Sequence, residues 1–90
     1  MQIVINSTLT LDADWVLDTV TRHGAQQLAI QLPGDTALKD AMKMVGCAKL
    51  TSVKENGVRT VYEGYTRLAS LIYSTDRKAL RLTLERDDEA

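Results

Sequence analysis

The chain has 90 residues, which is enough for one small domain and one hydrophobic core. Eleven Lys and Arg residues against twelve Asp and Glu residues leave a net charge of −1, whereas dedicated nucleic-acid binders usually carry a clear positive excess. One Cys and one His exclude an intrachain disulfide and a zinc site built from several such ligands. We expect a single α+β domain over residues 1–86, followed by a frayed acidic tail at 87–90.

The N-terminal quarter predicts a strand followed by a helix. Residues 2–11 alternate apolar and polar side chains, which indicates a strand that is bulged or broken near Ser7. Residues 12–24 then carry helix signals, because Asp12 can cap the first turn and Gly24 can end the last one. The apolar stripe of this expected helix consists of Ala13, Val16, Leu17 and Val20.

A second strand and a second helix are predicted next. Residues 28–32 alternate as a strand, which Pro33 and Gly34 interrupt. Asp35 or Thr36 can cap a helix that runs to Gly46 and whose apolar residues follow an i, i+3, i+4, i+7 spacing. These apolar residues are Leu38, Ala41, Met42 and Val45.

The C-terminal half changes to a period of two, which is typical of strands. Asn56-Gly57 predicts a tight hairpin turn between residues 49–54 and 58–63, because both residues tolerate positive φ. Residues 65–74 suit either a helix or a strand, and their Tyr, Thr, Ser and Ile content favours the strand. The last strand follows a turn and alternates Leu80, Leu82 and Leu84 with Arg81, Thr83 and Glu85.

These elements predict an α+β fold with the order βαβαβββ. If a helix crosses between the first two strands, those strands lie parallel and the sheet is mixed. We therefore expect two helices packed on a mixed sheet that ends in a C-terminal antiparallel meander.

The sequence assigns no catalytic, metal-binding or cofactor-binding residue. We expect His23 in the last turn of the first helix, where its charge suits the helix dipole, and Cys47 as a small buried apolar residue. The turn at residues 31–36 lacks the Gly spacing and the Lys of a phosphate loop. We therefore predict a non-enzymatic protein that needs no cofactor.

One surface of the predicted meander is the candidate interface. Tyr and Arg are enriched at the energetic centres of interfaces, because each combines a large contact area with a polar end. Such residues also stack on nucleic-acid bases, and a solvated sheet face carries them too. The candidate interface residues are Arg59, Tyr65, Arg67, Tyr73 and Arg81.

Residues 57–70, followed by a turn and by residues 80–85, form a run in which an aromatic-Gly-Tyr-Thr stretch leads into a closing hairpin. This run resembles a pattern in small proteins of Gram-positive phages and prophages. The resemblance covers about a third of the chain and implies a virion, tail-region or host-takeover protein that works by contact.

Two functions are therefore carried forward. The first is a phage or prophage protein that acts through protein–protein contact, in virion or tail-region assembly or in host-factor binding, with self-association through an exposed strand edge as one route. The alternative is a nucleic-acid-associated accessory protein that uses the Tyr and Arg side chains. No segment has the apolar length of a membrane helix or the pattern of a signal peptide, so we expect a cytoplasmic location, or the virion for a phage-encoded chain.

Overall fold

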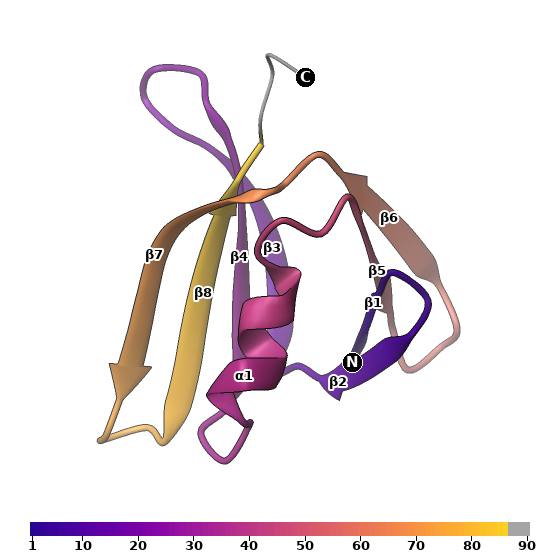
Figure 1. Ribbon diagram of the computed structural model, residues 1–90, viewed down its shortest axis with the longest axis vertical. Coiled ribbons are helices and arrows are strands. Elements are labelled where there is room, and N and C mark those ends of the chain that lie inside the picture. Colours follow the sequence, from indigo (N-terminus) through magenta and orange to yellow (C-terminus); the bar gives the residue numbers. More distant parts are fainter. Residues whose placement is uncertain (87–90) are drawn as a thin grey trace.

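The computed structural model describes residues 1–86 and consists mainly of two four-stranded antiparallel sheets (Figure 1). The acidic tail predicted at 87–90 lies outside the described residues. Sheet A has the strand order β2-β1-β5-β6. Its strands are β1 (Gln2–Ile5), β2 (Leu9–Asp12), β5 (Lys49–Val53) and β6 (Arg59–Glu63).

Sheet B has the strand order β3-β4-β8-β7, and all of its neighbouring strands are antiparallel. Its strands are β3 (Trp15–Val20), β4 (Gln26–Pro33), β7 (Arg67–Ser74) and β8 (Ala79–Glu85). The short helix α1 (Leu38–Ala41) continues into the 3-10 turn η1 (Met42–Met44), and α1 lies between the two sheets in the view of Figure 1. Within residues 1–86, no helix reaches the length and apolarity that crossing a membrane requires.

The predicted α+β class is therefore wrong. Residues 1–86 form two antiparallel sheets and one short helical segment, rather than two helices on a mixed sheet. The first predicted strand is a hairpin, because Asn6 and Ser7 adopt positive φ of 50° and 61° and reverse the chain between β1 and β2. The two strands expected to lie parallel, at residues 2–11 and 28–32, belong to different sheets and do not pair with each other.

The predicted first helix is the strand β3. Trp15, Val16, Thr19 and Val20 are aromatic or β-branched, and such side chains favour a pleated strand over a helix. Pairing with β4 along six residues supplies the backbone hydrogen bonds that a helix would have made internally. Gly24 does end the segment, but as part of a hairpin turn with φ of 85°.

The predicted second helix exists but is shorter than expected. It begins after Ala37, which makes no side-chain capping bond, so neither Asp35 nor Thr36 is the cap. α1 and η1 together cover residues 38–44, and Gly46 follows with φ of 80°. The predicted apolar stripe is only partly confirmed, because Ala41 is fully buried whereas Leu38 is 54% exposed and Val45 lies beyond the helical segment.

The C-terminal strands are confirmed, but their assembly into one meander is wrong. A hairpin turn joins β5 and β6 at the predicted place, but it spans Lys54–Gly57, with positive φ at Gly57 (87°) and not at Asn56. Residues 67–74 are extended. However, β6 ends one sheet and β7 begins the other. Gly64 has φ of 83°, and its amide donates to the Ala48 carbonyl at 3.1 Å, which directs the chain away from sheet A. The meander therefore divides into two separate hairpins.

The core lies between the inner faces of the sheets. The inner residues of β4 and β8 form one wall of it, and Leu50 of β5 with Ile3 and Ile5 of β1 forms the opposing wall. Met44 of η1 and Cys47, in the loop before β5, complete it, and the burial of Cys47 is as predicted. The fully or nearly buried residues of sheet B are Leu28, Ile30, Leu32, Leu80, Leu82 and Leu84.

Candidate binding surface

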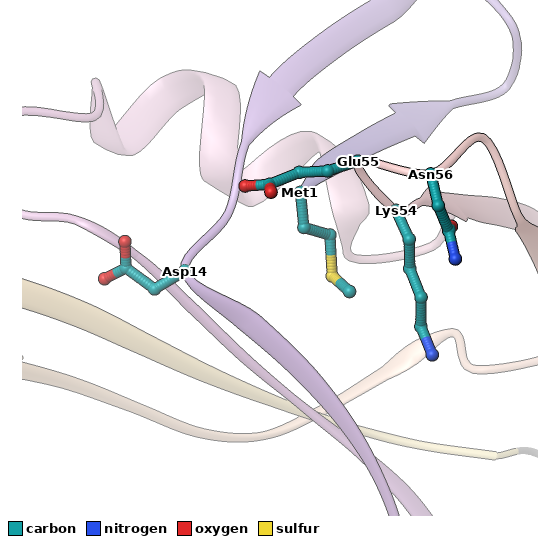
Figure 2. A pocket seen from close by; sticks show the side chains of 5 residues that line it. All are labelled: Met1, Asp14, Lys54, Glu55 and Asn56. Carbon is teal, nitrogen blue, oxygen red and sulfur yellow. The ribbon is translucent and has the colours of Figure 1, made fainter.

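An open depression near the N-terminus does not gather its polar groups (Figure 2). It has a volume of about 400 Å³ and is lined by residues from the N-terminus, the β2–β3 connection and the β5–β6 turn. Figure 2 shows that the charged ends of Asp14, Lys54 and Glu55 point in different directions. Within residues 1–86, no group of three or more His, Cys, Asp or Glu side chains is arranged to hold a metal ion. The charged groups of this depression therefore do not converge on one point.

The outer face of sheet B, which points away from the core, is the second candidate. Directly opposed residues in antiparallel strands share one face, so the register identifies its members. Leu80, Leu82 and Leu84 face the core, and the alternate residues of β8 face outward. The outer face comprises Trp15, Leu17, Thr19, Gln27, Ala29, Gln31, Arg67, Ser70, Ile72, Arg81, Thr83 and Glu85.

The Arg81 side chain is held at the middle of this face. Its guanidinium carbon lies 5.2 Å from the centre of the Trp15 ring, which is cation–π geometry. The guanidinium also donates to the Gln31 side-chain oxygen at 3.2 Å, and the Gln31 amide donates in turn to the Asp14 carboxylate at 3.2 Å. Three strands and the loop before β3 therefore fix one Trp–Arg pair. A fixed pair loses less side-chain entropy on binding than a mobile one.

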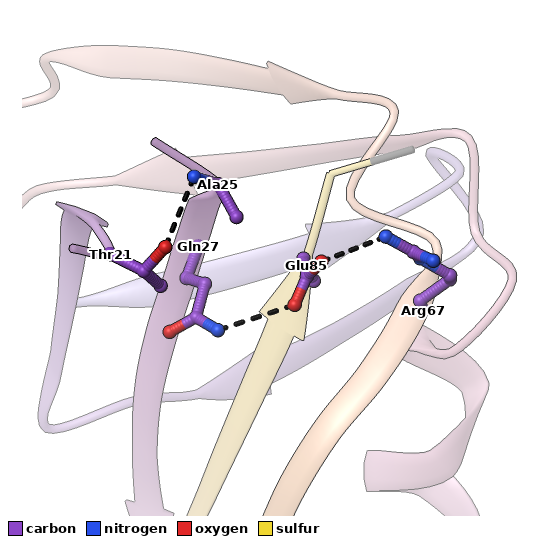
Figure 3. Close-up of polar contacts among 5 residues, drawn as sticks. All are labelled: Thr21, Ala25, Gln27, Arg67 and Glu85. Atoms are coloured by element: carbon purple, nitrogen blue, oxygen red, sulfur yellow. Dashed lines mark hydrogen bonds and ion pairs between the residues drawn. The ribbon is translucent and has the colours of Figure 1, made fainter. Parts of the chain in front are cut away.

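A second set of polar contacts crosses the sheet near the end of β8 (Figure 3). The Arg67 guanidinium donates to the Glu85 carboxylate at 2.8 Å, and the Gln27 amide donates to the other carboxylate oxygen at 3.4 Å. Beside them, the Ala25 amide donates to the Thr21 hydroxyl at 3.0 Å and braces the β3–β4 hairpin. Arg67 is therefore already neutralised within its own chain.

Two large aliphatic side chains flank the Trp–Arg pair. Leu17 of β3 is 55% exposed, and Ile72 of β7 is 54% exposed. Ile72 lies directly opposite Arg81 in the register, and Leu17 follows Trp15 on the same face of β3. The outer face thus exposes apolar area around a rigid aromatic and cationic centre, which is the composition of an interface core.

The predicted interface residues do not form one surface. Arg67 and Arg81 lie on the outer face of sheet B, whereas Tyr73 lies on the inner side of β7, opposite Leu80. The cause is a β-bulge between Leu68 and Ser70, which inserts one residue and reverses the alternation along β7.

The other two predicted residues lie elsewhere. Tyr65 stands in the connection between the sheets, where its ring meets the Tyr62 ring edge to face at 6.2 Å and packs against the core. Arg59 belongs to β6 in sheet A and is exposed. His23, expected in a helix, lies in the exposed β3–β4 turn.

The sequence prediction omits Trp15, Leu17, Gln31 and Ile72 from this surface. The helix predicted over residues 12–24 places Trp15 and Leu17 on different sides of the chain, so these two residues share no face in that prediction. The signal that reveals them is the β-branched and aromatic content of residues 15–21, since alternation along a strand puts Trp15, Leu17 and Thr19 on one face.

The comparisons with known proteins add no relative. No protein-family model matches the chain, and no curated protein or solved structure matches it significantly.

Proposed function

We propose that the protein is non-enzymatic and acts by binding another protein through the outer face of sheet B. The observation that carries this proposal is the Trp15–Arg81 pair, fixed by Gln31 and flanked by exposed Leu17 and Ile72. Trp and Arg contribute most strongly to binding when their positions are fixed before the partner arrives. The sheet is broad enough for such a contact, because its four strands carry six, eight, seven and eight residues.

The biological process that this contact serves is a separate proposal. The resemblance of residues 57–70 and 80–85 to small proteins of Gram-positive phages and prophages supports virion or tail-region assembly, or the binding of a host factor. The resemblance therefore supports the phage-related process, whereas the outer face of sheet B supports the protein–protein contact itself. No specific observation favours the nucleic-acid alternative. Arg67 is paired with Glu85, and neither Tyr65 nor Tyr73 lies on the outer face.

Two variants and one control test the contact. Leu17→Lys and Arg81→Glu change exposed or half-exposed positions of the outer face, so we expect both chains to fold. Val61→Lys is the matched control, because Val61 is 49% exposed on the outer side of an edge strand in sheet A. The measurement is quantitative affinity capture from the phage-carrying host, with mass spectrometry for each variant.

The expected result is a partner that the wild-type chain and V61K retain equally and that L17K and R81E lose by at least tenfold, which corresponds to about 1.4 kcal/mol. A partner lost equally by all three variants, or retained by all three, would contradict the assignment of the outer face.

A further inference from the structure

The four edge strands of the two sheets are not equally protected. Soluble proteins usually shorten an edge strand or place charges on it, because its free backbone groups otherwise pair with another strand. β2 has only four residues, β3 carries Asp18 in its middle, and β6 carries Arg59 and Glu63 at its ends. β7 has eight residues, and its single charge, Arg67, stands at one end and pairs with Glu85.

β7 also exposes apolar side chains on both of its faces. Ile72 is exposed on the outer face, and Leu71 and Tyr73 are exposed on the inner side. Figure 1 shows β7 at the margin of the molecule, with no other element beside its free edge. The inner side opens into an apolar groove of about 360 Å³ that is lined by Gly34, Thr36, Leu38, Leu71, Tyr73 and Leu80.

We propose that β7 pairs antiparallel with β7 of a second copy about a two-fold axis at Ile72, so that two B sheets merge into one of eight strands. In this register Ile72 opposes Ile72, Leu71 opposes Tyr73, and Ser70 opposes Ser74. Every opposed pair lies on one face, as antiparallel pairing requires. The five paired residues, 70–74, carry no charge, so no like charges meet.

The paired segment is nearly symmetric about Ile72. The order Ser70-Leu71-Ile72-Tyr73-Ser74 places one serine at each end and one large apolar residue on each side of the isoleucine. Beyond Ser74 the chain turns into β8, so residues 70–74 alone define the register. Pairing with its own copy sets serine against serine and apolar against apolar at every level. This self-complementarity favours a second copy of the chain over an unrelated strand.

The expected dimer is weak. A pair of edge strands with the Leu71, Ile72 and Tyr73 side chains buries on the order of 1,000 Å², near the lower limit for specific association. We expect a dissociation constant on the order of micromolar. The inference rests on the proposed contact function, but it concerns the edge of sheet B rather than the Trp15–Arg81 centre, so different variants test the two.

The experiment is sedimentation equilibrium of the purified chain over a concentration series. The wild-type chain should move from its 10.0 kDa monomer mass toward twice that value as concentration rises. Ile72→Lys places two ammonium groups against each other on the axis, and we expect the dissociation constant to rise at least tenfold. Tyr73→Lys changes a 55% exposed position on the inner side of β7. It places an ammonium group against Leu71 of the other copy and should also raise the dissociation constant several-fold, without altering the outer face.

Val61→Lys is again the control and should dimerise like the wild-type chain. A wild-type chain that remains monomeric up to about 1 mM would overturn the inference. So would a dimer that I72K and Y73K leave intact, because it would use another surface. If that dimer is lost in L17K instead, the outer face rather than the edge joins the copies, and the two proposals are thereby separated.

Discussion

The two sheets have the same strand arrangement, but the side chains on their outer faces differ. Both sheets have four antiparallel strands, with apolar inner residues that meet in one core. The middle of sheet A presents small β-branched side chains to solvent, namely Val4, Thr10, Thr51 and Val61. Sheet B presents Trp15, Leu17, Ile72 and Arg81.

The edges of the sheets differ in the same direction. β6 closes sheet A with Arg59 and Glu63, whereas β7 ends sheet B with an uncharged run from Leu68 to Ser74. Large side chains and an uncharged edge are therefore concentrated in one sheet. This contrast is the basis of the proposal that a partner covers sheet B rather than sheet A.

The largest test of this comparison concerns which face of sheet B is buried. Leu82→Ala removes a fully buried side chain from the middle of β8, and we expect a loss of about 3 kcal/mol in the free energy of unfolding. Thr83→Ala, the neighbouring change on the outer face, should cost less than about 1 kcal/mol. Urea unfolding of both variants measures the difference. Equal losses would mean that the inner and outer faces are assigned wrongly.

A second test concerns the contact between the β4 end and the β7–β8 turn. The Gly34 amide donates to the Lys78 carbonyl at 2.6 Å, and a Cβ on Gly34 would collide with that carbonyl group. Gly34→Ala should therefore cost about 2–3 kcal/mol, because backbone must move.

Gly24→Ala is the matched control for Gly34→Ala. Gly24 has φ of 85° with open space around it, so its substitution should cost only the backbone strain of about 1–2 kcal/mol. Thermal unfolding that ranks Gly24→Ala as the more harmful change would contradict the close approach at Gly34.

The smallest expected effect concerns the polar contacts of the outer face. Arg67→Ala removes the ion pair with Glu85, and the 61% exposure of the Arg67 side chain limits its value to about 0–1 kcal/mol. The loss should shrink at 1 M salt, which screens exposed charges. Arg59→Ala, a change on sheet A, should show a smaller loss. Urea unfolding at low and high salt measures both variants. A loss above about 2 kcal/mol in the unfolding free energy of R67A would contradict the description of Arg67–Glu85 as an ordinary exposed ion pair.

The sequence predicted those elements whose local signals agree with their tertiary pairing. Asn56-Gly57 gave the β5–β6 hairpin, and the alternating leucines of β4 and β8 gave the two central strands of sheet B. Residues 12–24 were misread because Val16, Leu17 and Val20 also satisfy a helical spacing. Only the pairing of β3 with β4, a tertiary contact, decides between the two patterns.

The candidate surface was predicted in part for the same reason. Alternation on β8 correctly placed Arg81 outward, and Arg67 lies on the same face. The position of Tyr73 was not predictable, because the bulge near Ala69 leaves no sequence signal such as Gly and yet reverses every side chain after it. Trp15 required the strand assignment of β3.

The most direct test of the contrast between the two sheets is an amide NMR dilution series on the wild-type chain. Pairing of sheet B through its open edge predicts that concentration-dependent shifts are confined to residues 67–76 and their neighbours on β8, while β6 stays unchanged. Shifts centred on residues 59–63, or no shifts up to about 1 mM, would contradict the account.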